Sequence, residues 1–138
     1  MISIRIQRQK DGMRVAAVGH AGLAPRGYDP VCAGVSALLY GYIAYLEGLS
    51  PVKESGREAG QESGQGAGQE EKPHLERVEG DGYLTVTTHG LRGADLFGWQ
   101  VTEAGLRLIR SAYPTCLQIG YETASGPKQS TGGKKRAL

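Results

Sequence analysis

A thiol and an imidazole lie twelve residues apart near the start of the sequence, at Cys32 and His20. A thiolate is a strong nucleophile, and an imidazole within reach can take the thiol proton and later pass it to a leaving group. Asp29 and Pro30 are typical of a helix start, because aspartate caps exposed backbone amides and proline fits the first helical position. Cys32 would then be the third helical residue, where unpaired amides and the helix dipole stabilise a thiolate. The pattern predicts a cysteine nucleophile with His20 as its general base.

Each of these residues also has an ordinary structural interpretation. Cys32 could be a small apolar residue of the core, although an apolar stripe through Val31 and Val35 would leave it about 100° from the centre of that stripe. His20 could be a surface residue at the end of a strand. Asp29 is explained by helix capping alone, but its carboxylate could also orient the imidazole as the third member of a triad.

Three further residues are candidate substrate-binding positions. Gly22 and Gly27 lie in the 21–29 segment, which is predicted to be a mobile loop between a strand and the helix. Ser36 follows Cys32 by one helical turn on the same face. Its hydroxyl either lines the site or is an ordinary polar group on the helix surface.

The cysteines and histidines do not form a metal-binding pattern. No Cys-x-x-Cys or His-x-x-x-His spacing occurs, so neither a metal nor another cofactor is predicted. Met1 leads directly into an alternating strand and not into a secretory leader, and no apolar run is expected to be as long as a membrane span. These features predict a cytoplasmic protein with reduced thiols and no membrane contact.

The charge balance gives no argument for a nucleic-acid or membrane partner. The sequence has 16 basic and 14 acidic residues, a formal net charge of +2, which provides no strong long-range field. Residues 124–138 are predicted to be a disordered tail that contains Lys134, Lys135 and Arg136. Contact with nucleic acid is therefore expected to be at most weak and confined to this tail.

The elements that must position the site follow from hydrophobic periodicity. We expect strands at 2–9, 13–19, 75–79 and 83–89 and a short final strand at 117–121. We expect helices from Pro30 to before Gly48 and from about Ala94 to Ala112. The order β-β-α-β-β-α predicts an α+β fold of two layers, with the helices packed on one face of a mostly antiparallel or mixed sheet. Four tandem tetrads lack large apolar residues, so residues of about 51–74 are predicted to be a flexible insertion in a single domain, 1–123.

The sequence resembles a known family around both candidate residues. It is similar to the bacterial ribosomal-processing cysteine protease family, Prp, in Gly19-His20-Ala21-Gly22 and, after eight variable residues, in Val31-Cys32-Ala33-Gly34-Val35-Ser36-Ala37-Leu38. The later glycine-rich hairpin, the amphipathic helix and Tyr113-Pro114 also resemble the family. The repeat insertion, the basic tail and Pro30 depart from it.

The resemblance implies a cytosolic endopeptidase that removes a short N-terminal extension from large-subunit ribosomal protein twenty-seven, usually as a homodimer. By position, His20 matches the family's catalytic histidine, Cys32 its nucleophile, Asp29 an acidic residue linked with catalysis, and Ser36 a serine near the site. In the mechanism we expect, the thiolate attacks an extended peptide held under the 21–29 loop, and amides at the helix start stabilise the oxyanion.

Two other functions stay open on the sequence alone. The chain could be a non-catalytic ribosome-associated binding module, in which Cys32 and His20 are structural. It could also be a thiol-dependent hydrolase or redox sensor of small molecules. For the protease, Cys32→Ala should abolish cleavage of a ribosomal-protein precursor and leave the fold and peptide binding largely intact. Cleavage that survives this substitution would refute Cys32 as the nucleophile.

Overall fold

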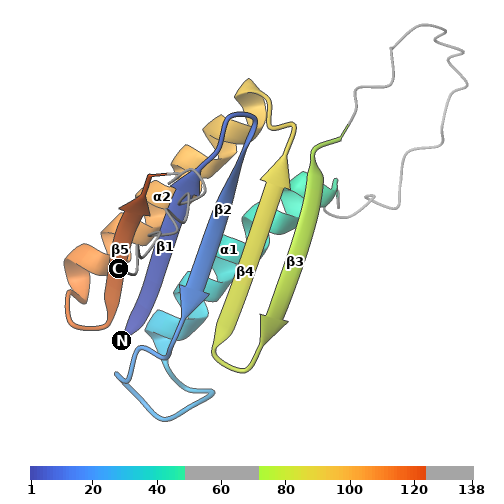
Figure 1. Ribbon diagram of the computed structural model, residues 1–138. Helices are drawn as coiled ribbons and strands as arrows, with labels where there is room; N and C mark the ends of the chain where they lie inside the picture. Colours follow the sequence, from blue (N-terminus) through green and yellow to red (C-terminus); the bar gives the residue numbers. More distant parts are fainter. Residues whose placement is uncertain (49–71, 124–138) are drawn as a thin grey trace, which may run out of the picture.

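The computed structural model describes residues 1–48 and 72–123. Its elements in chain order are β1 (Ile2–Arg8), β2 (Gly12–Val18), α1 (Pro30–Glu47), β3 (His74–Gly80), β4 (Tyr83–His89), α2 (Gly93–Ala112) and β5 (Leu117–Glu122) (Figure 1). Each predicted strand and helix is present, with ends that differ by about one residue. The predicted tail at 124–138 and all but the last three residues of the predicted insertion at 51–74 lie outside the described residues.

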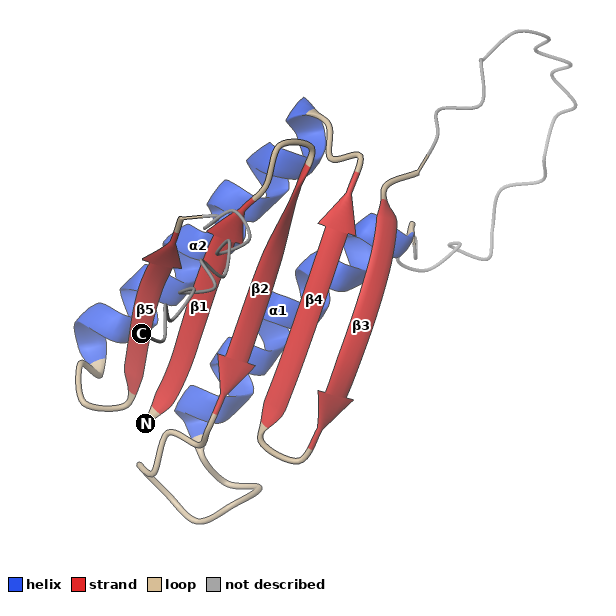
Figure 2. Ribbon diagram, viewed as in Figure 1, coloured by secondary structure: helices blue, strands red, loops and turns tan. Residues whose placement is uncertain are grey.

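The five strands form one mixed sheet in the order β3-β4-β2-β1-β5. The pairs β1–β2, β2–β4 and β3–β4 are antiparallel, whereas β5 pairs with β1 in parallel. Both helices lie on one face of the sheet (Figure 2), which confirms the predicted two-layer α+β fold. β5 also runs in the same direction as β4, which precedes it in the chain, so the two strands need a long crossover connection, and α2 provides it.

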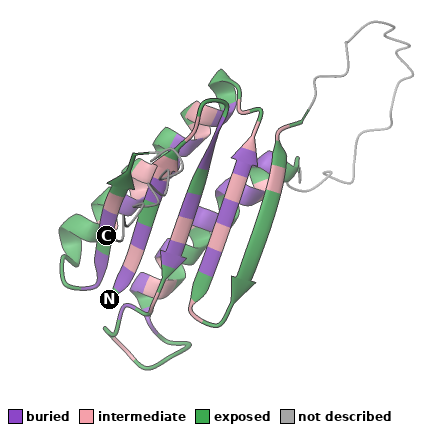
Figure 3. Ribbon diagram, in the orientation of Figure 1, coloured by how far each residue is buried: buried purple, intermediate pink, exposed green. Residues whose placement is uncertain are grey.

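In β1, β2, β4 and β5, residues alternate between a buried face toward the helices and a more exposed face, whereas the edge strand β3 is almost wholly exposed (Figure 3). Apart from Gly12, the buried strand residues are apolar with the single exception of Thr88: Ile2, Ile4, Ile6, Met13, Val15, Ala17, Leu84, Val86, Thr88, Leu117 and Ile119. This period of two is the pattern on which the strand predictions were based.

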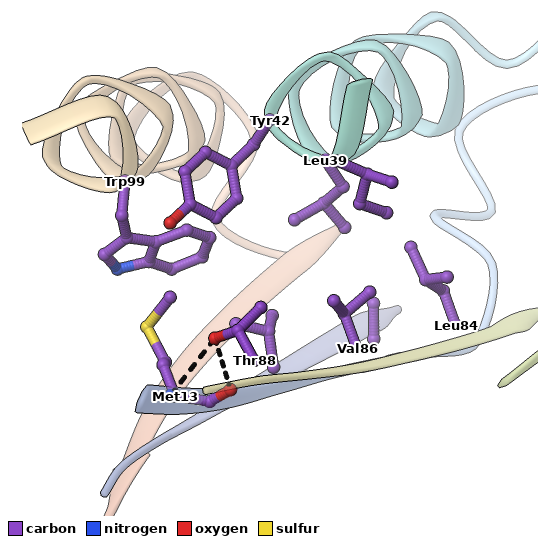
Figure 4. Close-up of a pocket in the computed structure, with 10 residues that line it drawn as sticks. Met13, Leu39, Tyr42, Leu84, Val86, Thr88 and Trp99 are labelled. Carbon is purple, nitrogen blue, oxygen red and sulfur yellow. Dashed lines mark hydrogen bonds between the residues drawn. The ribbon is translucent and has the colours of Figure 1, made fainter. Parts of the chain in front are cut away.

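The helices cover this face with large side chains. Trp99 of α2 and Tyr42 of α1 meet above Met13 and Thr88 (Figure 4), with their rings edge to face and the ring centroids 5.4 Å apart. The Thr88 Oγ1 donates to the Met13 carbonyl oxygen at 3.0 Å and accepts from the Met13 N–H at 3.2 Å. The cavity between these residues measures about 10 Å³, room for about one water at most. It is a gap in the packing and not a ligand site.

The two helices approach each other at glycines. A Cβ built on Gly105 would lie 2.9 Å from Leu38 Cδ1, and one on Gly34 would lie 3.1 Å from Ile109 Cδ1. Glycine in a helix interior, such as Gly105, costs about 1 kcal/mol relative to alanine. The close approach of Leu38 is the packing that offsets this cost.

α1 is capped at both ends and buries one side. Asp29 caps its start, and Gly48, with φ of +67°, ends it by donating its N–H to the Ala44 and Tyr45 carbonyls. By length and composition α1, with a mean hydropathy of 1.2, is also apolar enough to span a membrane, contrary to the expectation that no run is that long. Core helices pass the same test, and α1 packs its buried residues toward the sheet and α2.

Candidate active site

Cys32 lies in the first turn of α1, half-buried at the edge of the core. Its Sγ accepts a hydrogen bond from the Ala21 backbone N–H at 3.3 Å. Cys116, the other free thiol, is buried just before β5. The predicted position of Cys32 as third helical residue is therefore observed, and the two thiols have different surroundings.

Asp29 is buried and uses both carboxylate oxygens to hold backbone amides. Its Oδ1 accepts from the N–H groups of Val31 at 2.9 Å and Cys32 at 3.2 Å, which is the predicted helix cap. Its Oδ2 accepts from the N–H groups of Leu23 at 2.8 Å and Ala24 at 3.1 Å in the preceding loop. One carboxylate thus joins the loop to the helix start that carries the thiol.

The same four amides determine the ionisation of Asp29. Burial by itself raises the pKa of this carboxyl, but the four backbone hydrogen bonds stabilise the carboxylate and together lower the pKa below the ordinary value of 3.8. The group is therefore a carboxylate at neutral pH, as a helix cap requires. The structure shows the capping role of Asp29, and its role in orienting His20 stays a prediction.

The amides at the helix start are already bonded. Besides Val31 and Cys32, the N–H of Ala33 donates to the main-chain oxygen of Asp29 at 3.1 Å. A donor held by the cap is not free to stabilise an oxyanion, so this conformation does not meet the expectation that these amides would do so. The backbone donor at the sulfur is the Ala21 N–H, from the loop that precedes α1.

His20 follows the end of β2 and lies against the turn between β3 and β4. The turn is docked there by the Gly19 N–H, which donates to the Gly82 carbonyl oxygen at 2.8 Å. The Nε2 of His20 is 3.9 Å from Asp81 Oδ1, and a Cβ on Gly82 would lie only 2.8 Å from the same nitrogen. The His20 side chain is 54% exposed. Its ring lies directly on the turn, which has room for it because residue 82 is glycine.

His20 and Cys32 line one pocket of about 170 Å³. Its lining comes from the end of β2, the first turns of α1 and the β3–β4 turn. These segments lie at the same end of the sheet (Figure 1). Ser36 lines the same pocket, so three of the predicted site residues share it. Gly22 and Gly27 lie outside the lining, and their φ angles of +74° and +85° shape the loop.

Sequence reasoning missed the residues that the second hairpin brings to the pocket. Gly80, Gly82 and Tyr83 line it, together with Tyr40 of α1. The Tyr40 hydroxyl donates to the Glu79 carboxylate at 2.6 Å, and this hydrogen bond, with a smaller contribution from burial, raises the pKa of Tyr40. Gly80-Asp81-Gly82 is recognisable as a turn in the sequence, but its neighbours depend on how the strands pair.

The remaining histidines lie away from this pocket. His74 and His89 face each other across β3 and β4, at the end of the hairpin opposite its turn. His74 is 3.4 Å from a Glu76 carboxylate oxygen and His89 is 3.6 Å from one of Asp11. Within residues 1–48 and 72–123, no group of three His, Cys, Asp or Glu side chains is arranged to hold a metal ion.

A reachable thiol and an imidazole that share a pocket are the groups a thiol hydrolase uses, and this is the class that the fold and the site define. The sequence model of the family described as cysteine protease Prp matches residues 1–118, most of the 138-residue chain, so the chain belongs to this family of cysteine proteases. No curated protein matches the sequence at a significant level.

Solved structures show the same fold. The essential ribosomal processing protease Prp from S. aureus, in complex with a covalently linked product peptide, is 22% identical, with a TM-score of 0.65 over 88% of this chain and 100% of that chain. The same protease with a substrate peptide is 19% identical, with a TM-score of 0.57 and the same coverage. SMU.848 from Streptococcus mutans is 21% identical, with a TM-score of 0.56 over 89% of this chain and 95% of that chain.

Proposed function

We propose that this cysteine protease cleaves its substrate with Cys32 as nucleophile and His20 as general base. The observation that carries the proposal is the pocket that these two residues share with Ser36. The chain has two cysteines, and Cys116 is buried and lies outside the lining of that pocket. The family membership calls for a reactive thiol, and Cys32 is the one a peptide can reach.

The reaction follows from the two groups. His20 takes the thiol proton, and the Cys32 sulfur attacks the carbonyl carbon of the scissile bond to form a tetrahedral oxyanion. The oxyanion collapses, the C–N bond breaks, and His20 gives its proton to the leaving amine. Water then attacks the thioester, again with His20 taking a proton, and the carboxylic acid product and the free thiol are released.

The proposed substrate is the N-terminal extension of large-subunit ribosomal protein twenty-seven. Support comes from the family and from the S. aureus relatives, which are described as ribosomal processing proteases in complex with a substrate or product peptide. The pocket is lined by His20 and Cys32, the residues on either side of the 21–29 segment. We propose that this loop, 21–29, covers the bound peptide.

Incubation of the purified full chain with the ribosomal protein precursor, followed by mass spectrometry of the products, tests the proposal. One cut that separates the extension from the mature protein is expected, with loss of cleavage in Cys32→Ala and strong loss in His20→Ala. Cys116→Ala is the matched control, since it removes the other thiol, and it should cleave normally. Cleavage that persists in Cys32→Ala would refute the nucleophile, and an uncut precursor beside a cut unrelated peptide would refute the substrate.

We also propose that the protein is a homodimer. α2 exposes three large apolar side chains on one face, because Phe97, Val101 and Leu108 are spaced four and seven residues apart. They are 66%, 58% and 73% exposed, which is unusual for a helix whose other side is packed. Light scattering after gel filtration should give twice the mass of the chain, and Val101→Glu with Leu108→Glu should give a monomer. A monomeric parent protein would refute the dimer.

We propose a cytoplasmic location, which agrees with two free thiols in the structure. Fractionation of cells that express the chain at its native level should recover it with soluble cytoplasmic proteins, and recovery in the membrane or secreted fraction would refute the proposal. Weak nucleic-acid contact through residues 124–138 also stays a proposal. A chain truncated at residue 123 should then bind RNA less than the full chain does.

A further inference from the structure

A general base acts best when a second group fixes its ring, and the sequence suggested Asp29 for this role. Both oxygens of Asp29 are used by backbone amides. The ion-pair partner that the described residues give His20 is Asp81, whose Oδ1 is 3.9 Å from Nε2. This carboxylate comes from the turn between β3 and β4, far in the sequence from the segments that contain His20 and Cys32.

The turn that carries Asp81 is attached to the strand end that carries His20. The backbone hydrogen bond from Gly19 to Gly82 joins the neighbours of the two residues at 2.8 Å. Gly82 lets the ring lie directly on the turn, since any larger residue would place Cβ 2.8 Å from Nε2. Asp81 and His20 are therefore held side by side by main-chain geometry.

Asp81 is also held from its other side. The Arg26 guanidinium, from the loop before α1, donates to the same Oδ1 of Asp81. The side chains of His20 and Asp81 are 54% and 62% exposed, so charge alone would not keep the carboxylate in one position. The Arg26 guanidinium and the His20 imidazole thus face the same carboxylate oxygen, so the loop, the strand end and the turn meet at Asp81.

We propose that Asp81 is the positioning residue of this protease: its carboxylate orients the His20 ring toward Cys32 and stabilises the imidazolium that forms when the thiol is deprotonated. The inference rests on the proposed function, in which His20 is the base. It assigns the orienting role to a residue of the second hairpin. Asp29 then serves the helix start and the loop.

Alkylation of Cys32 by iodoacetamide tests this proposal without a substrate. The full chain is used in a Cys116→Ala background, so that one thiol reacts, and the rate is followed by intact-protein mass at neutral pH. Asp81→Asn should slow alkylation about two- to fivefold, the effect expected of an exposed charged pair, and Asp81→Glu should recover part of the rate. In a His20→Ala background Asp81→Asn should have no further effect, because Asp81 acts through the imidazole.

Glu76→Gln is the matched control. Glu76 lies on the same hairpin and pairs with a histidine, His74, but at the end away from the pocket, so its removal should leave the rate unchanged. If Asp81→Asn is alkylated as fast as the control, or if it slows alkylation equally with and without His20, the positioning role of Asp81 is overturned. His20 as the base is not affected by either result. A His20→Ala rate equal to that of the parent would instead overturn His20 as the base, and with it the proposed function.

Discussion

The sharpest test of the site geometry is a methyl group added at Gly82. This residue has φ of +72°, and a Cβ there would lie 2.8 Å from His20 Nε2 and 3.4 Å from Cε1. Alanine in the left-handed region costs about 1–2 kcal/mol in stability. The contact itself costs less fold stability, because an exposed side chain can move away from it. The ring is then displaced from the turn, and a reacting group moved by about 1 Å can lose up to about a hundredfold in rate.

Gly90→Ala separates the two effects. Gly90 has φ of +71°, almost the same backbone conformation, but its Cβ would meet nothing within 4 Å. Both variants should therefore lose similar stability, about 4–8 °C in Tm for each kcal/mol in a domain of this size. Only Gly82→Ala should lose cleavage, by about tenfold or more in kcat.

Thermal unfolding and precursor cleavage would be measured on the two variants side by side, at a temperature where both are folded. Equal kcat values for the two variants would refute the idea that the bare turn at Gly82 positions His20. A large loss of stability in Gly82→Ala but not in Gly90→Ala would also refute this idea, because it would show that the added methyl group distorts the turn and does not displace the imidazole.

Three further predictions concern the rest of the molecule. The pKa of Asp29 is lowered in the folded chain, so its contribution to stability is present above the unfolded pKa of about 3.9 and is lost as pH falls through the lower folded pKa. In Asp29→Asn, the free energy of unfolding measured with urea should therefore change less with pH over this acid range. Thr88→Val should cost about 1–3 kcal/mol in the same assay, since it strands the buried polar groups of Met13, and no loss would count against that bond. Leu106→Ala, at a position with 0% exposure, should cost about 2–5 kcal/mol, and a loss below 1 kcal/mol would contradict the packing described for α2.

The local parts of the fold could be predicted from the sequence because their causes are local. Alternation over a few residues fixes which face of β1 is buried, and Asp29 with Pro30 marks the start of α1 to the residue. The same reasoning placed Cys32 in the first helical turn. Strand order was not predicted, because nothing local in β5 shows that it pairs in parallel with β1 at the edge of the sheet.

Sequence alone could predict only those site residues that come from one continuous segment of the chain. His20, Cys32 and Ser36 lie within one stretch of sequence, and the pocket includes all three. Asp81 and Gly82 come from a turn whose contact with His20 depends on the register of β4 against β2, where Val18 is paired with Tyr83. A one-residue change of that register would move the turn away from the imidazole, so sequence alone could not place it there.

Two carboxylates hold the loop before α1, and they do so independently. Asp29 binds the Leu23 and Ala24 amides on the inner side, while Asp81 binds Arg26 on the outer side. A peptide that displaces Arg26 would break the outer contact and leave the inner one, so the cap on the Cys32 helix would stay formed. The thiol can therefore keep its position while the outer part of the loop moves, which is what a site that must both admit a chain and hold a nucleophile requires.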